Sequence, residues 1–254
     1  MLEKIQLGLD LTALEKDKFT AVRLRFDTIA QACFDAKIQL YVDSEDSFYQ
    51  NPIDDLVYEL MEKYNKERAV VFNTYQMYRV GMLDNLKAAG EKGKEKGYHV
   101  GAKLVRGAYL EKERERADEM GYQDPIMTDK KSTDQQYDDA LRYCVKNIDT
   151  IELCSGTHNE NSNYLLVELI EKYKLDKNDN RIYFAQLFGM SDHITFNLAN
   201  AGYNVVKYVP FGPIETVIPY LLRRAEENTS IAGQSSRELE LIKKELKRRK
   251  GKVV

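Results

Sequence analysis

Short apolar runs alternate with longer amphipathic stretches along most of the chain. Six of the runs are rich in β-branched and aromatic residues, which favours strands, and they cover residues 38–42, 69–72, 100–105, 151–154, 182–185 and 205–209. The stretches between them carry helix signals: Asn51 and Pro52 open an amphipathic run that ends at Tyr64, and Asp192 opens another that ends near Gly202. The pattern predicts strands and helices in alternation.

Strands that alternate with helices form βαβ units, in which neighbouring strands run parallel. Repetition of such units over 254 residues favours a barrel. A doubly wound sheet is disfavoured because no Gly-x-Gly-x-x-Gly motif follows any of the runs. The sequence therefore predicts an α/β fold of the (β/α)8 TIM-like barrel type, with residues 1–254 as one domain.

The two ends of the chain depart from this alternation. Residues 1–36 are helical in character with no strand before them, and Thr12 and Glu15 have the spacing of a capping box. Residues 235–254 form a charged segment that is rich in lysine and arginine toward its end. We expect a helical lead-in over residues 1–36 and a charged helix over residues 235–254, which either contacts anionic lipid or stays solvated.

Composition narrows the classes of partner. The 38 basic and 41 acidic residues give a net charge of -3, so no overall field attracts nucleic acid. Cys33, Cys144 and Cys154 are an unclustered set in a chain without an apolar signal region, which indicates core thiols in a reducing compartment. We expect a small-molecule partner, no nucleic acid and a cytoplasmic location, with peripheral contact at the inner membrane face left open.

The histidines do not suggest a metal centre. His99, His158 and His193 show no His-Glu-x-x-His pattern, and no cysteines stand at ligand spacing, so no metal site is predicted. No serine or cysteine lies in a nucleophile elbow, which argues against acyl transfer. His158, which follows Thr157 at a strand end, is a candidate to hydrogen-bond a cofactor.

One predicted strand carries a charged residue. Lys103 lies within the apolar run 100–105, and its burial is costly unless it meets an anion or an electron-rich group, so it suggests a cofactor contact. The turn after it, Arg106-Gly107-Ala108, has no bulky side chain at its centre, so its backbone N–H groups could approach a phosphate. A tight strand-to-helix turn with a surface arginine explains the same residues equally well.

The predicted helix over residues 217–227 has polar residues where an apolar face is usual. Tyr220, Arg223, Arg224 and Glu227 follow helical i, i+3, i+4 and i+7 spacing, and we call them the arginine face. Glu227 can orient a guanidinium, which leaves other donors for a carboxylate or phosphate. The alternative is a salt-bridged face exposed to solvent.

Several motifs together resemble the FAD-dependent proline dehydrogenases. The match runs in order from Asp43 to Glu227, and its most specific segments are residues 103–109 (KLVRGAY), 157–159 (THN), 208–212 (YVPFG) and 220–228 (YLLRRAEEN). The residues within these segments resemble those of the single-function enzymes more than those of the bifunctional ones. The resemblance implies a distorted (β/α)8 barrel with its last helix over the barrel mouth. The family's first strand, which carries a lysine that contacts the substrate carboxylate, has no counterpart in this chain.

The resemblance also implies roles for individual residues. Asp43 and Lys103 are implied as catalytic, with Lys103 near flavin N5. The residues implied to bind L-proline are Arg223, Arg224, Tyr208, Tyr220, Tyr109 and Leu187, with Glu227 holding an arginine. The residues implied to contact FAD are Ser44, Asn73, Lys103, Val105, Arg106, Gly107, Ala108, Thr157 and His158.

The implied reaction takes a hydride from the ring carbon next to nitrogen to flavin N5, giving 1-pyrroline-5-carboxylate, and the electrons pass to a quinone. Two other hypotheses stay open: an inactive barrel fragment, and another anion-binding barrel enzyme such as one acting on a phosphorylated sugar. Loss of a barrel strand would expose two sheet edges, so we expect oligomerisation, aggregation or weak flavin binding.

Overall fold

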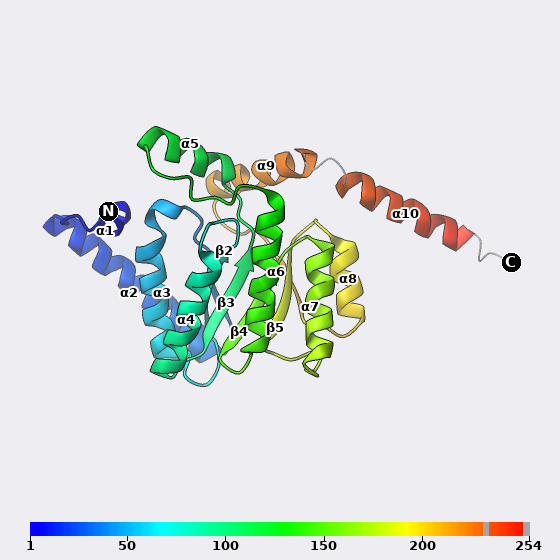
Figure 1. Cartoon of the computed structure of the whole chain (residues 1–254), viewed down its shortest axis with the longest axis horizontal. Coiled ribbons are helices and arrows are strands. Elements are labelled where there is room, and N and C mark those ends of the chain that lie inside the picture. The colour runs from blue at the N-terminus through cyan, green and yellow to red at the C-terminus, as the bar shows by residue number, and fades with distance from the viewer. Residues whose placement is uncertain (231–233, 251–254) are drawn as a thin grey trace.

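The computed structural model describes residues 1–230 and 234–250, apart from the side chains of residues 223, 225–230 and 234–238. Figure 1 shows strands at the centre of the molecule, with helices packed along them and a last helix that extends away from the body. None of the helices in this described part is both long and apolar enough to cross a membrane.

A single parallel sheet forms the centre of the fold. Its strands, each paired with its neighbour in the sequence, are β1 (Leu40–Val42), β2 (Val71–Gln76), β3 (Val100–Val105), β4 (Ile151–Gly156), β5 (Ile182–Leu187) and β6 (Val205–Tyr208). All six strands predicted from the apolar runs are confirmed, and so is the parallel α/β class. The sheet curls into half of a barrel.

A closed eight-stranded barrel is not confirmed. Within residues 1–230 and 234–250 the sheet has six strands, with β1 and β6 at its two edges. Closure would require these two edges to pair through further strands, and β1 offers only three residues for pairing. The observed fold is therefore an open half-barrel.

Helices surround the sheet in the predicted alternation. They are α1 (Leu2–Gln6), α2 (Ala13–Ala36), the 3-10 helix η1 (Ser47–Tyr49), α3 (Gln50–Tyr64), α4 (Met82–Lys96), α5 (Leu110–Met120), α6 (Lys130–Lys146), α7 (Glu160–Lys172), α8 (Asp192–Asn200), α9 (Ile214–Ser230) and α10 (Gln234–Lys250). The segment expected as a helical lead-in contains α1 and α2. The predicted capping box is also present: the Thr12 hydroxyl accepts from the Glu15 amide, and the Glu15 carboxylate accepts from the Thr12 amide.

The two faces of the sheet have different neighbours. Alternate residues such as Val71 and Tyr75 of β2 and Leu104 of β3 join the hydrophobic core with α3, α4, α6 and α7. The other face, which we call the inner face, carries the residues between them. The strand register there aligns Thr74 with Lys103, and Lys103 with Cys154, in one row across the sheet.

The carboxyl ends of the strands meet at one edge of the sheet, as in any parallel arrangement. In Figure 1 the helices α5 and α9 lie above this edge, and α10 extends beyond it. We call this region the mouth. The helix α9 carries the arginine face. The fold places this helix over the strand ends, where the resemblance implied it.

Candidate functional site

The counter-ion of Lys103 is Asp43, which directly follows the edge strand β1. Its ammonium donates to both carboxylate oxygens of Asp43, at 2.6 Å to Oδ1 and 2.8 Å to Oδ2. Thr74 donates its hydroxyl to Asp43 Oδ1 at 2.7 Å. The Lys103 side chain is 15% exposed and that of Asp43 is 48% exposed. The two residues predicted as catalytic therefore lie together, and the pair offsets the cost of burying the lysine.

Aromatic rings surround this ion pair. The Lys103 ammonium lies 5.8 Å from the ring centre of Tyr41 and 5.9 Å from that of Tyr208. Both distances fall within the range over which a cation is attracted to an aromatic face. The inner face thus holds a fixed positive charge, with apolar rings around it and a half-exposed carboxylate beside it.

Arg106, at the start of the β3–α5 turn, is fixed by three elements. Its guanidinium donates to Asp134 at 2.7 Å, to Thr157 Oγ1 at 2.6 Å and to Ser162 Oγ at 2.9 Å. The central carbon of the guanidinium, Cζ, lies 4.3 Å from the ring centre of Tyr137. These contacts exclude the alternative of a loose surface arginine, because three donors and one face of the group are engaged by the protein.

Gly107 and Ala108 complete the turn. Gly107 has a φ of 128°, and a Cβ atom there would lie 2.3 Å from ring carbons of Tyr78. The backbone therefore presses directly on that ring. The Ala108 N–H, which the sequence suggested as a phosphate donor, already donates to Glu45 Oε1 at 2.6 Å. The turn is ordered by the protein itself, between β2 on one side and the segment after β1 on the other.

His158 contributes a neutral imidazole to the mouth. Burial, together with the nearby cations Lys207 and Arg224, lowers the pKa of its imidazole from 6.5 to about 4. Nδ1 of His158 lies 2.9 Å from the hydroxyl oxygen of Ser191. The ring is therefore uncharged at neutral pH and can hydrogen-bond a bound group without adding charge. The preceding residue, Thr157, accepts the Arg106 hydrogen bond.

The α9 helix brings part of the arginine face to the mouth. The rings of Tyr208 and Tyr220 meet edge to face with centres 5.8 Å apart, and the Arg224 guanidinium lies 5.2 Å from the Tyr220 ring centre. The side chains of Arg223 and Glu227 lie outside those the structure describes. Two of the four predicted residues are thus seen together above the strand ends.

The other residues implied to contact proline lie at the same edge. Leu187 ends β5 and pairs in register with Tyr208 of β6. Tyr109 is the residue before α5, and its ring centre lies 5.2 Å from the ammonium of Lys112. Val105, from the set implied to contact FAD, is the last residue of β3 and pairs with Gln76.

Asn73 and Ser44 are not brought to the inner face in the same way. Asn73 is buried on the core side of β2, where its amide donates to Asp54 at 2.8 Å. The Ser44 hydroxyl is also buried and accepts from Gln50 at 2.6 Å. Both side chains serve the protein's own polar network, so a contact with a cofactor stays a prediction.

Gln76 is a residue that the sequence reasoning missed. It is fully buried at the carboxyl end of β2, and its Nε2 donates to the backbone oxygen of Ser44. Its carbonyl oxygen Oε1 has no hydrogen-bond partner among the described residues. A buried polar atom without a partner costs about 1–3 kcal/mol, so this oxygen points to an N–H donor on a bound group. The signal in the sequence was a glutamine at a strand end.

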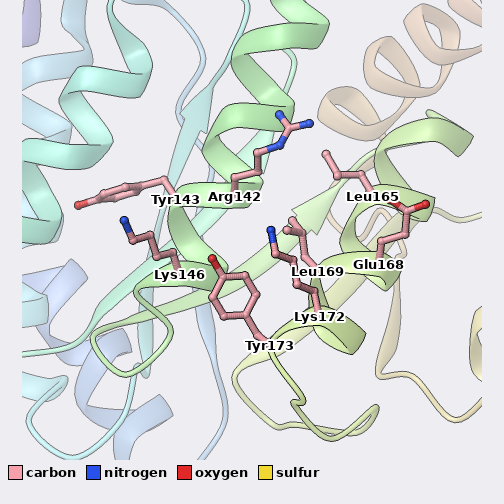
Figure 2. A pocket seen from close by; sticks show the side chains of 8 residues that line it. All are labelled: Arg142, Tyr143, Lys146, Leu165, Glu168, Leu169, Lys172 and Tyr173. Carbon is pink, nitrogen blue, oxygen red and sulfur yellow. The ribbon is translucent and has the colours of Figure 1, made fainter.

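A pocket of about 330 Å³ lies elsewhere, between α6 and α7. Figure 2 shows side chains from both helices facing it, and they are Arg142, Tyr143, Lys146, Leu165, Glu168, Leu169, Lys172 and Tyr173. None of these residues belongs to the mouth. In the described part of the chain, no group of three or more histidine, cysteine, aspartate or glutamate side chains is arranged to hold a metal ion.

Comparison with known proteins identifies close sequence relatives. The family model described as "Proline dehydrogenase" matches residues 3–237. "Proline dehydrogenase 1, mitochondrial" of Homo sapiens is 39% identical over 241 residues, which is 94% of this chain and 40% of the relative. The protein of the same name from Dictyostelium discoideum is 40% identical over 232 residues, 89% of this chain and 41% of the relative.

A relative with a different name is also similar. "Hydroxyproline dehydrogenase" of Xenopus laevis is 36% identical over 230 residues, which is 89% of this chain and 49% of the relative. The chain therefore spans less than half the length of these three curated relatives.

The fold has solved counterparts. The crystal structure of proline utilization A (PutA) from Bdellovibrio bacteriovorus inactivated by N-propargylglycine has a TM-score of 0.78 and 24% sequence identity, and the match covers 86% of this chain and 23% of that one. A PutA variant from Bradyrhizobium japonicum has a TM-score of 0.74 at 21% identity, over 83% of this chain and 21% of that one. At these identities the likeness concerns the fold.

Proposed function

Because the chain belongs to the proline dehydrogenase family, we propose that it oxidises L-proline to 1-pyrroline-5-carboxylate as a single-function enzyme, with FAD as cofactor and a quinone as electron acceptor. The observation that carries the proposal is a series of contacts at the mouth: Arg224 lies over the Tyr220 ring, that ring meets Tyr208, and the Tyr208 ring lies near the Lys103 ammonium. A carboxylate bound by an arginine there would lie above a fixed cation on the inner face.

The residues at the mouth fit a flavin. The unpaired, buried Oε1 of Gln76 can accept from an N–H group, which the flavin ring carries. The residues proposed to hold FAD are Ser44, Asn73, Gln76, Lys103, Val105, Arg106, Gly107, Ala108, Thr157 and His158. When bound, FAD would supply the hydride acceptor, N5, and the redox chemistry.

The chain's own residues would position the substrate. Arg223 and Arg224 can each present paired N–H donors to a carboxylate, and Glu227 can hold one of them in place. The rings of Tyr208, Tyr220 and Tyr109, with Leu187, would wall the pyrrolidine ring and exclude water. Fixing the ring in one pose lowers the entropic part of the barrier, which is a major source of rate enhancement.

Lys103, held by Asp43, would stabilise negative charge that develops during the reaction. The ammonium of Lys103 is held by both oxygens of Asp43, so it keeps one position at the inner face. A preorganised cation stabilises negative charge that develops next to it during the reaction, because no reorganisation is needed at that moment. This is the catalytic role that we propose for the pair.

Several broader features are proposed with this function. The last turn of α10 is basic, with Lys247, Arg248, Arg249 and Lys250. The same helix exposes apolar side chains along its length, at Leu239, Ile242 and Leu246. An amphipathic basic helix of this kind supports peripheral contact with an anionic membrane, where a quinone would be found. We also propose a reducing compartment, an oligomer that covers the sheet edges, and a distorted eight-stranded barrel as the closed form of the fold.

The central experiment is the visible spectrum of the purified chain during titration with FAD. We expect one flavin per chain, bleached by L-proline. The Arg224→Met variant should bind FAD as the parent does but show a KM for proline higher by at least about tenfold, because a charged hydrogen bond is lost. Arg142→Met, which alters an exposed arginine on α6, is the matched control and should behave as the parent.

A colourless protein that takes up no FAD would contradict the proposal and favour the inactive fragment.

Substrate preference is a second readout. The Tyr220 hydroxyl would crowd an added ring hydroxyl, so we expect proline to be preferred over hydroxyproline. Equal turnover of the two by the reconstituted enzyme would contradict that preference.

A further inference from the structure

Glu45 lies at the mouth between two parts of the site and has no role in the function proposed above. It follows β1 by three residues, next to the Asp43–Lys103 pair. Its Oε1 accepts the Ala108 N–H at 2.6 Å, across 63 residues of sequence. This contact joins the segment after β1 to the turn after β3, where the backbone is pressed against Tyr78.

The backbone of the turn is held from two sides. On the β2 side, the amides of Met77 and Tyr78 donate to the carbonyls of Val105 and Arg106, each at 2.7 Å. These bonds fix the beginning of the turn. At the end of the turn, the Glu45 carboxylate accepts from the Ala108 amide. A charged acceptor makes this bond stronger than one between neutral groups.

The neighbours of Glu45 favour its charged form. Burial raises the pKa of the Glu45 carboxyl, and the Ala108 N–H, the Tyr78 hydroxyl and the Arg224 guanidinium oppose that rise. The geometric contact is the hydrogen bond from the Ala108 amide, which joins Glu45 to the turn.

We propose that Glu45 is a positioning residue that anchors the turn Arg106–Ala108 to the segment after β1. The hydrogen bond from the Ala108 amide carries this inference. Its consequence for FAD binding rests on the proposed function, in which the same turn holds the cofactor.

Two substitutions separate the hydrogen bond from the charge of Glu45. Glu45→Gln keeps an oxygen that can accept the Ala108 N–H but removes the negative charge. Glu45→Ala removes both. Glu115→Gln, which neutralises an exposed carboxylate on α5, is the matched control. The measurements are hydrogen exchange at the Ala108 amide in the full chain, and FAD affinity by titration.

We expect exchange at Ala108 to be faster by about tenfold or more in Glu45→Ala and to stay within about twofold of the parent in Glu45→Gln, because only the alanine variant loses the acceptor. FAD affinity should fall with exchange protection, in Glu45→Ala alone. Glu115→Gln should match the parent throughout.

Equal protection at Ala108 in the parent and in Glu45→Ala would overturn the inference, whether or not the chain oxidises proline. An unchanged FAD affinity in Glu45→Ala, in a chain that binds FAD, would overturn the link between the anchored turn and the cofactor. A parent that neither binds FAD nor oxidises proline, with protection still lost in Glu45→Ala, would overturn the proposed function and leave the anchor intact.

Discussion

At the scale of single residues, Gly107 sets the shape of the β3–α5 turn. Its φ of 128° lies in a region that residues with a side chain rarely adopt, and the space where a Cβ would stand is filled by the Tyr78 ring. Two independent constraints therefore act at one position. The ring is itself buried, so it has little room to move aside.

We predict that Gly107→Ala lowers the free energy of unfolding by about 2–4 kcal/mol, from the clash and the backbone strain together, and reduces flavin content. Gly97→Ala is the control, since Gly97 also has a positive φ of 66° but nothing within 4 Å of the added atom. It should cost only about 1 kcal/mol. Urea unfolding measures both, and equal losses would contradict the steric argument.

His158 makes stability depend on pH. Its folded pKa of about 4 lies below the unfolded value near 6.5, so between these values the unfolded chain binds a proton that the folded chain does not. Stability attributable to this residue is therefore present above pH 6.5 and is lost as the pH falls toward 4. We predict a loss of up to roughly 3 kcal/mol across that window.

Unfolding in urea at several pH values, for the parent and for His158→Gln, measures this loss. The substitution removes the titrating group, so the difference between the two proteins should change across the window. Two curves that run parallel from pH 7 to pH 4 would show that the imidazole is not held neutral by the fold.

At the scale of elements, the capping box at the start of α2 can be tested directly. Thr12→Ala removes the acceptor of the Glu15 amide, and we predict a loss of about 1 kcal/mol in the free energy of unfolding. Thr20→Ala is the control, because the Thr20 hydroxyl bonds to the Lys16 carbonyl within the same helix. That change should be neutral or slightly stabilising, since alanine has the higher helix propensity. Similar losses in the two variants, measured by thermal unfolding, would rule out a special role for the cap.

The strands were predictable from the sequence, but the carboxyl end of β2 was not. The apolar run 69–72 predicted a strand that stopped at Phe72, whereas β2 continues to Gln76. The polar residues Asn73 and Thr74 are buried in the strand because Asp54 and Asp43 supply their hydrogen bonds. Those partners come from other elements, so no local pattern could reveal them.

The site was predictable in part for the same reason. Lys103 within an apolar strand indicated that an anion or an electron-rich group lay nearby, and the structure supplies Asp43. The Arg106 turn left two explanations open, and the structure adds three hydrogen bonds that hold its guanidinium, while a contact with a cofactor stays a prediction. The roles of Glu45 and Gln76 depend on contacts between β1, β2 and β3, which appear only when the sheet is assembled.

At the scale of the whole molecule, the three cysteines report on how the fold opens. Cys33, Cys144 and Cys154 are all buried, as the sequence predicted, with Cys33 at the margin on α2. Burial raises the pKa of the Cys154 thiol to about 11, so the reactive thiolate is scarce in the folded state.

We predict that a thiol reagent labels Cys144 and Cys154 together, only when the sheet unfolds. Cys33 should be labelled at a lower denaturant concentration, because α2 packs at the periphery against α3 and can open locally. Mass spectrometry of the labelled peptides across a denaturant series measures the order. Labelling of Cys144 in the native protein as fast as in an unfolded peptide would contradict the observed core.

The order of the strands in the sheet is also the order in which they are synthesised. Each strand from β2 to β6 pairs with the strand that directly precedes it in the chain. A chain that emerges from the ribosome can therefore add strands one after another, and none has to wait for a later segment. The growing edge is then the only newly exposed edge at each stage, which confines the risk of mispairing during translation to one strand at a time.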